Sequence, residues 1–358
     1  MKKITSLFLA VYLSLSLYAQ GRQTIDIPDI QGYITLKCDF HIHTVFSDGQ
    51  VWPTVRIDEA YRDGLDAISI TDHVEVRPYV TGSHNRGYEI ARDLAKSRGI
   101  ILIRGSEITR PMPPGHHNAI FLNNSDELDT PDYMDAFRAA HAQGAFIFWN
   151  HPGEHQPDTT RWWADHATLY EQGLMQGIEI VNRDKYYAQA HQWSIDKKLT
   201  LFGSSDIHEP MPPFAPGKHR TMTLVFADSA TPEAIHEALK ERRTAVYFEN
   251  YIIGEEKYLK ELFDNALEWN MRKSGNVVNV TVRNKSDLTF ILQKTRHDPR
   301  LVYFSNMSLT PFTIQPKGTH SFTVRLLHGI EEGDVNFIVE NFLVQPNKGM
   351  NYTLKVGQ

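Results

Sequence analysis

The sequence predicts an α/β domain followed by a smaller all-β domain, and two observations support this division. From the start of the mature chain to about residue 250, short apolar runs alternate with amphipathic helical stretches. That alternation is typical of a parallel sheet, open or closed. From Ser274 onward the pattern changes to short runs in which apolar and polar residues alternate. A period of two residues predicts the strands of a small antiparallel, Ig-like sandwich.

The first twenty residues have the pattern of a secretory signal peptide. Two lysines at positions 2 and 3 precede an apolar run over residues 4–18, and the small residue Ala19 follows it. The run is short for a membrane span. We therefore expect residues 1–20 to be removed, with no stable membrane anchor left; an anchor that stays on the protein is the alternative. The expected location is the periplasm or the extracellular space of a bacterium, where the single cysteine, Cys38, has no internal disulfide partner.

The remaining chain divides at a charged amphipathic segment. We expect the α/β domain over residues 21–254, a linking helix over 255–273 and the sandwich over 274–358. The helices expected between the strands of the first domain cover residues 55–64, 133–143, 188–198 and 232–242. The strands expected in the sandwich cover residues 277–282, 290–292, 312–314, 321–324 and 337–339.

Histidine and acidic residues gather where the predicted strands of the first domain meet loops. Residues two apart in a strand point to the same face, so His41 and His43 are expected to aim two imidazoles at one point. In parallel α/β barrels the C-terminal ends of all strands open on one face, which is where such side chains meet. The six clusters are Asp39–Gly49, Ala67–His73, Ile100–Glu107, Gly115–Leu122, Ala145–Pro152 and Leu199–His208.

Each cluster alone has an ordinary interpretation. His151, before a proline, fits a hydrogen-bonding residue at a strand end, and Asp48, before Gly49, fits a turn. Asp72 fits either a turn or a partner that orients a histidine. Six clusters of the right residue types in succession favour a metal site over these separate interpretations. Imidazole and carboxylate ligands without thiolate suit Zn, Mn or Fe.

The motif series His-x-His…Ser-Asp-Gly, Thr-Asp-His, Gly-x-Glu, His, Asn-His-Pro and Asp-x-His, in this order, resembles the PHP superfamily (polymerase and histidinol phosphatase). The resemblance covers about residues 33–250 and is strongest to exported PHP phosphodiesterases with a β-domain after the barrel. It implies a distorted (β/α)7 barrel that binds two to three divalent metal ions, usually Mn, Zn or Fe.

The resemblance also implies a role for each motif residue. It places His41, His43, Glu107 and Asp206 on a first metal. It has Glu107 bridge to a second metal that His116 and His151 complete. It assigns Asp48, His73 and His208 to a third.

His116 and His117 are adjacent, so only one of them can face the site from an extended segment. The family pattern favours His116, which leaves His117 as a surface or packing residue.

The expected chemistry is hydrolysis of a phosphate ester by a metal-bound hydroxide, with phosphodiesters preferred to monoesters because of the resemblance to the sandwich-bearing branch. Glu107, Asp206 and His73 are the expected catalytic groups, together with Arg110, which could bind a phosphate oxygen or simply lie on the surface. Further substrate contacts are expected from loop residues at the same face, with solvated loops as the alternative: His84, Arg86, His155 and Lys185.

Two other functions compete with this one. An amidohydrolase-type barrel also opens with His-x-His, but it usually bridges its metals with a carboxylated lysine, whereas Glu107 occupies that strand here. A non-catalytic surface or glycan-binding protein is the rival from another class, and the intact ligand set argues against it. The net charge of −6 and the lack of a basic run disfavour a nucleic-acid partner and leave a small phosphate ester as the expected substrate.

Overall fold

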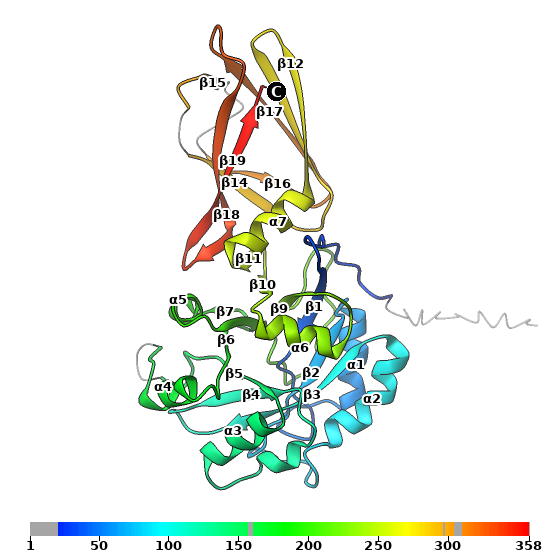
Figure 1. Ribbon diagram of the computed structural model, residues 1–358. Helices are drawn as coiled ribbons and strands as arrows, with labels where there is room; N and C mark the ends of the chain where they lie inside the picture. Colours follow the sequence, from blue (N-terminus) through cyan, green and yellow to red (C-terminus); the bar gives the residue numbers. More distant parts are fainter. Residues whose placement is uncertain (1–20, 157–159, 296–297, 304–309, 358) are drawn as a thin grey trace, which may run out of the picture.

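The computed structural model describes residues 21–156, 160–295, 298–303 and 310–357, so the predicted signal peptide lies outside the described residues. Figure 1 shows two lobes, an α/β barrel below and a β-sandwich above, with helix α7 at their junction. Among the described residues, no helix is long and apolar enough to cross a membrane.

The α/β lobe alternates strands and helices along the chain. Its strands are β1 (Ile34–Asp39), β2 (Ala67–Ile70), β3 (Ile101–Thr109), β4 (His116–Ile120), β5 (Phe146–Trp149), β6 (Gly177–Asn182), β7 (Lys185–Tyr186), β8 (Thr200–Ser204), β9 (Met222–Ala227), β10 (Thr244–Phe248) and β11 (Tyr251–Gly254). Its helices are α1 (Pro53–Arg62), α2 (Arg86–Arg98), the 3₁₀ turn η1 (Ser125–Leu128), α3 (Tyr133–Ala142), α4 (Ala164–Glu171), α5 (Ala188–Asp196) and α6 (Pro232–Lys240).

Local signals explain where these helices begin. Prolines stand at the start of α1 and α6, where the missing N–H costs no hydrogen bond. The Thr231 hydroxyl caps α6 by accepting a hydrogen bond from the backbone N–H of Ala234. The four helices expected from the sequence are present, and none of their ends differs from the expected position by more than two residues.

The barrel departs from an all-parallel one because some strands, such as β4 and β9, run against their neighbours. Strands β1, β2 and β3 are parallel, and so are β5, β6 and β8, but β4 pairs antiparallel with both β3 and β5. The start of β4 therefore lies at the same rim as the ends of its neighbours, and His116 pairs with Thr109 near the end of β3. This reversal brings the histidines at the head of β4 to the rim that carries the other motif residues.

Side chains close the barrel between β8 and β9. The Thr223 hydroxyl accepts a hydrogen bond from the backbone N–H of Gly203 at 3.0 Å and donates to the Gly203 carbonyl at 2.9 Å. Gly203 also lets β10 approach closely, because a Cβ on it would lie 2.3 Å from a methyl carbon of Val246. Hydrogen bonds of the Thr223 hydroxyl thus take the place of backbone hydrogen bonds between β8 and β9.

The sandwich has two sheets. The first contains β12 (Leu267–Ser274), β13 (Val277–Asn284), β15 (Leu301–Tyr303) and β17 (Thr319–Leu326), and the second contains β14 (Phe290–Lys294), β16 (Phe312–Ile314), β18 (Gly333–Gln345) and β19 (Lys348–Val356). Alternating apolar residues of both sheets form the core between them. The second sheet continues into the barrel, because β18 pairs in parallel with β11.

The predicted linking helix is wrong in its second half. Helix α7 (Glu256–Ala266) ends at Ala266, and Leu267 begins strand β12, which pairs with β13 along its whole length. From Leu267 to Met271 apolar and polar residues alternate, and every second side chain packs inward. This alternation is a strand pattern, which pairing with β13 satisfies despite the charges of the segment.

Candidate metal centre

Nine side chains converge at the rim formed by the strand ends, as the motifs predict. Strand ends or the loops directly after them supply most of these residues, because the parallel strands present their C-terminal ends to one side. Glu107 lies within β3, and His116 opens the reversed strand β4. The nine residues form four overlapping groups whose potential ligand atoms lie within 4.8 Å of one another: His41, His43, Asp48, His73, Glu107, His116, His151, Asp206 and His208.

Glu107 stands at the centre of the arrangement. Its Oε2 lies 3.4 Å from His41 Nε2 and 3.3 Å from His43 Nε2, while its Oε1 lies 3.1 Å from His116 Nδ1 and 3.6 Å from His151 Nε2. The two carboxylate oxygens therefore face two different groups of histidines. This is the position that a ligand bridging two metal ions needs.

Asp206 completes the group around His41 and His43. Its Oδ1 lies 3.2 Å from the Nε2 atom of each histidine. Asp206 has a φ of 47°, a left-handed conformation that aspartate adopts more readily than most residues.

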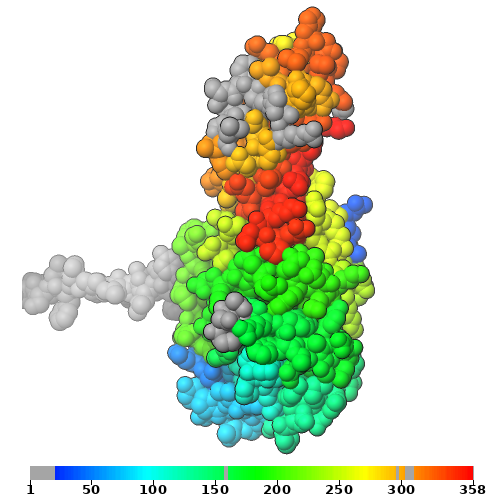
Figure 2. Space-filling model, turned by 90° about the vertical axis from the view of Figure 1, so that its left-hand side faces the viewer, coloured from blue at the N-terminus to red at the C-terminus, as the bar shows by residue number. Residues whose placement is uncertain are grey.

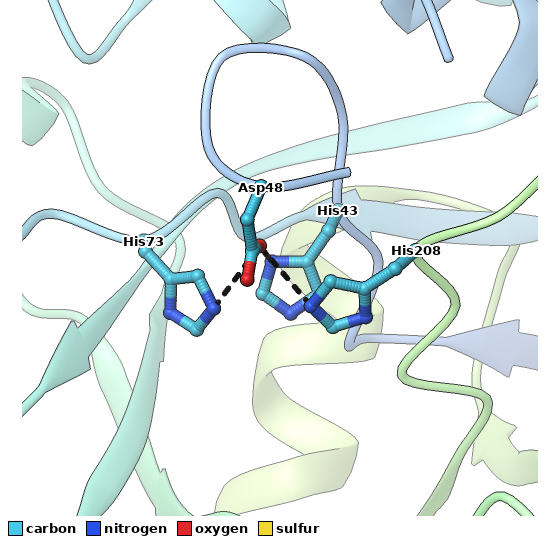
Figure 3. Close-up of side chains that lie close together, drawn as sticks. All are labelled: His43, Asp48, His73 and His208. Atoms are coloured by element: carbon cyan, nitrogen blue, oxygen red, sulfur yellow. Dashed lines mark ion pairs between the residues drawn. The ribbon is translucent and has the colours of Figure 1, made fainter. Parts of the chain in front are cut away.

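A third group opens toward solvent. Figure 3 shows His43, Asp48, His73 and His208 pointing toward one another. Asp48 Oδ1 lies 3.4 Å from His73 Nε2 and 3.1 Å from His208 Nε2. Asp48 is about one-third exposed, whereas Glu107 and His43 are completely buried, so this group forms the outer part of the centre.

The donor set fits divalent metal ions. Six buried ligand atoms have no hydrogen-bond partner among the described residues, although each lies close to another ligand: His41 Nε2, His43 Nε2, Asp48 Oδ1, Glu107 Oε2, His116 Nδ1 and Asp206 Oδ1. Buried polar atoms are normally satisfied, and a shared cation would satisfy these. Imidazole nitrogens and carboxylate oxygens are ligands for Zn, Mn or Fe.

The pKa shifts of the ligands also fit a site for divalent cations. Burial, with the neighbouring His73, lowers the pKa of His43 to about 3. Burial also acts to lower the pKa of His73, but Glu107 and Asp48 raise it to about 10. Burial acts to raise the pKa of Glu107, yet the nearby His73 and His41 hold it well below its ordinary value. Protonated histidines thus balance the buried carboxylates in the positions that divalent cations would take.

Glu179 of β6 orients two ligands, a role that was not predicted from the sequence. Its Oε1 accepts a hydrogen bond from His41 Nδ1 at 2.9 Å, and its Oε2 accepts from the backbone N–H of His151 at 2.7 Å. With the proton on Nδ1, the Nε2 lone pair of His41 faces Glu107 and Asp206. A carboxylate in an otherwise apolar, fully buried strand is the sequence signal that could have found it.

Replacing Glu179 with glutamine should weaken the centre without removing a ligand. The amide group keeps one acceptor and places an NH₂ group against a donor, so His41 loses its fixed tautomer. We expect a 10- to 100-fold loss of metal affinity or turnover, which is typical of partners behind metal ligands. Metal titration and steady-state kinetics would measure it, with the exposed Glu171→Gln on α4 as the control. An unchanged metal affinity in Glu179→Gln would contradict this role.

Asp72 supports the loop after β1 and makes no hydrogen bond to a histidine among the described residues. Its carboxylate accepts hydrogen bonds from the Thr44 backbone N–H and hydroxyl and from the Ser47 hydroxyl. Its contacts match neither the turn residue nor the direct partner of a histidine that the sequence suggested: Asp72 anchors the loop that carries Asp48.

Arg56 of α1 holds the segments on which three ligands stand. Its fully buried guanidinium donates to the carbonyl oxygens of His43, Ile207 and His208 and pairs with Glu59 at 2.7 Å. Backbone carbonyls from two distant segments are thus tied to one rigid cation. The sequence gives little sign of this role, because an arginine on an amphipathic helix is usually on the surface.

The structure separates His116 from His117. His116 faces Glu107, whereas His117 is completely buried on the other face of β4, next to Phe137, Trp149 and His166. Its place is therefore in the core, which suits the packing role and not the surface role that the sequence also allowed.

The residues expected to bind substrate are dispersed. Arg110 pairs with Glu75 at 2.7 Å and donates to the Thr130 carbonyl, so its guanidinium is already engaged. His84 lies near Asp129 and Arg77, and Arg86 pairs with Glu89 at the exposed start of α2. The other two lie nearer the centre: the His155 ring is 5.8 Å from that of His116, and Lys185 lies over the ring of Tyr187.

Arg183 is a positively charged residue beside the centre whose role was not predicted from the sequence. It follows β6 directly, its side chain is half exposed, and its Nη2 donates to the Asp206 carbonyl at 3.0 Å and lies 3.2 Å from His208 Nδ1. Its Nε is 3.6 Å from Asp206 Oδ2. It therefore places a permanent positive charge at the open side of the third group. The only sequence sign was its position immediately after a buried strand.

Comparisons with known proteins agree with the two-lobed architecture. A family model for an Ig-like domain matches residues 267–355, which include β12. A crystal structure from Bacteroides vulgatus, of a two-domain protein containing a predicted PHP-like metal-dependent phosphoesterase, is similar over nearly the whole chain. It is 50% identical with a TM-score of 0.90, and the match covers 94% of this chain and 100% of that one.

Two further likenesses are more limited. The chain is 34% identical over 76 residues to a 5′-3′ exoribonuclease of Haemophilus influenzae, a match that spans 21% of this chain and only 24% of that relative. A proposed metal-dependent phosphoesterase from Bifidobacterium adolescentis is 16% identical with a TM-score of 0.42, covering 56% of this chain and 95% of that one. A score this low does not establish a shared fold.

Proposed function

The chain belongs to the family of two-domain, PHP-like metal-dependent phosphoesterases, and from this premise we propose that it hydrolyses small phosphodiesters outside the cytoplasm. The observation that carries the proposal is the convergence of nine imidazole and carboxylate side chains around the shared Glu107. Two or three ions of Mn, Zn or Fe are the cofactors that we propose, held by the overlapping groups that share these ligands.

Divalent ions bound there would activate a water molecule and neutralise charge on the phosphoryl oxygens. Water adds to phosphorus as the ester P–O bond breaks, so that the products are a phosphomonoester and an alcohol. Arg183 is placed to pair with a non-bridging phosphate oxygen, because its half-exposed guanidinium lies beside His208 at the open side. His155 and Lys185 remain candidates for contacts with the rest of the substrate.

Three observations support the finer parts of the proposal. The 76-residue likeness to an exoribonuclease, an enzyme that cleaves phosphodiester bonds, favours diesters over monoesters. The net charge of −6 favours a small substrate over a long nucleic acid. The basic and apolar pattern of residues 1–20 favours export.

A substrate panel tests the proposal. Mn-loaded protein should hydrolyse bis(p-nitrophenyl) phosphate and small natural diesters at least about tenfold faster, by kcat/KM, than the matching monoesters. Short RNA oligonucleotides in the same panel separate a small-diester enzyme from an exonuclease. A clear preference for monoesters, or turnover of RNA alone, would replace the proposed substrate class while leaving the family intact.

A further inference from the structure

We propose that the sandwich domain completes the substrate side of the active site, by fixing the segment Arg183–Tyr187 through the β18–β19 hairpin. We call this segment the β6–α5 connector, since it joins β6 to α5 and includes β7. The inference rests on the proposed function in one respect, namely that Arg183 binds the phosphate group. Figure 2 shows the red β18–β19 region resting against the green part of the barrel that contains the connector.

The hairpin is built into the barrel and does not merely touch it. Ile253 of β11 pairs with Leu343 of β18, so the two domains share a continuous sheet. The Leu343 side chain is 7% exposed and belongs to the hydrophobic cluster of the barrel, together with Val181 of β6 and Tyr187 of the connector. Leu343 therefore belongs to the same hydrophobic core as residues on either side of Tyr186.

The turn of the hairpin makes a polar contact with the middle of the connector. The Tyr186 hydroxyl accepts a hydrogen bond from the backbone N–H of Asn347 and lies 2.8 Å from His191 Nδ1. Burial lowers the pKa of His191 to about 4, so a neutral ring with its proton on Nε2 can accept a hydrogen bond from the Tyr186 hydroxyl at Nδ1. Asn347 has a φ of 56°, which suits the second position of a Pro346-Asn347 turn and fixes the direction of its N–H.

A cavity lies beside this contact, so the packing around Tyr186 is open on that side. The cavity has a volume of about 350 Å³, and its lining includes Tyr186 and Phe248 of the barrel and Glu340, Leu343 and Asn347 of the hairpin. Pairing of β7 with β6 holds the backbone of Tyr186, whereas its ring borders the cavity, so the hairpin and His191 contacts help to set where the ring and hydroxyl lie.

The connector meets the metal centre at both of its ends. Arg183 donates to the Asp206 carbonyl and lies beside His208. At the other end, the Tyr187 ring packs against Gly153. A Cβ atom on Gly153 would lie 2.5 Å from a carbon of that ring. The Tyr187 hydroxyl is buried with no hydrogen-bond partner among the described residues. Movement of Tyr186 would therefore displace groups at the open side of the centre.

A matched pair of leucines tests the inference in the full-length protein. Leu343→Ala removes the contact with the barrel cluster, whereas Leu354→Ala makes the same change on β19, within the sandwich core and at similar burial. We expect Leu343→Ala to lower kcat/KM for bis(p-nitrophenyl) phosphate about tenfold at unchanged metal content, an effect typical of residues that act through a site residue. Leu354→Ala should lower the melting temperature and leave kcat/KM unchanged.

The same comparison in an Arg183→Ala background shows whether the hairpin acts through Arg183. If it does, adding Leu343→Ala to Arg183→Ala changes kcat/KM little further, because the group that it positions is already missing. Tyr186→Phe, which removes the hydroxyl but little volume, should give a smaller loss in the same direction and serves if Leu343→Ala fails to fold. Equal kcat/KM values for Leu343→Ala, Tyr186→Phe and Leu354→Ala would overturn the inference, as would fully additive losses with Arg183→Ala.

Binding of inorganic phosphate to metal-loaded protein separates this inference from the proposed function. Calorimetric titration should show about tenfold weaker phosphate binding in Leu343→Ala than in Leu354→Ala, whether or not the diester is turned over. If the wild type hydrolyses no diester yet the phosphate affinities differ in this way, the proposed substrate is wrong and the role of the hairpin stands. If the affinities are equal while the diester is hydrolysed, the hairpin inference fails alone.

Discussion

Glu107→Ala is expected to remove metal from two groups at once and to lower turnover about a thousandfold, the scale of losing a central charge-stabilising group. The reason is geometric: Oε2 faces His41 and His43, while Oε1 faces His116 and His151. Elemental analysis of the purified variant should show a loss of more than one metal equivalent, and diester hydrolysis should fall in parallel.

Two controls separate the loss of a ligand from the loss of the fold. Glu107→Gln keeps the shape and an acceptor for the Asn150 amide, which lies 2.9 Å from Oε1, but removes the charge and the second metal-binding oxygen. It should therefore fold and still lack metal. Circular dichroism and the melting temperature report folding for both variants. Full metal content and full activity in Glu107→Ala would refute the bridging assignment.

His116→Ala and His117→Ala should separate metal binding from stability, although the two residues are adjacent. His116→Ala removes a side chain that faces Glu107, so we expect it to lose metal from the second group and to lower turnover by orders of magnitude at nearly unchanged stability. His117→Ala leaves a cavity beside Phe137 and Trp149, so we expect a loss of about 2–4 kcal/mol in the free energy of unfolding. Its metal content and its activity per folded molecule should stay close to wild type.

Chemical denaturation, metal analysis and kinetics on the two variants, side by side, check this prediction. The full burial of His117 changes the size of the expected effect, because a surface histidine would have been worth only about 0.5 kcal/mol. If His117→Ala lost the metal and His116→Ala only stability, the faces of β4 would be assigned the wrong way round.

The sequence predicted the metal centre better than its surroundings because metal ligands leave a local trace. A histidine or carboxylate at the end of an apolar run, as at His73 or His151, can be read from a few consecutive residues. The order of six such ends then identified the PHP family, which the two-domain relative confirms, together with the fold class.

What the sequence did not show depends on the direction of strands and on contacts between distant segments. The run that contains His116 carries no sign that β4 is antiparallel, although this reversal is what brings His116 to the rim. The charges of residues 267–274 favour a helix, although the alternation from Leu267 to Met271 already suits the strand that pairs with β13. Arg56 and Arg183 act on backbone segments far away in the sequence, so their roles follow from tertiary structure alone.

The most direct test of the account is the metal content of the purified protein together with its response to a chelator. Protein prepared with Mn or Zn should hold two to three metal equivalents, lose its phosphodiester hydrolysis when they are removed, and regain it when Mn is restored. Glu107→Ala carried through the same procedure should not regain activity. Less than one equivalent in folded wild-type protein, or hydrolysis that is indifferent to complete metal removal, would contradict the assignment of these nine residues as a metal centre.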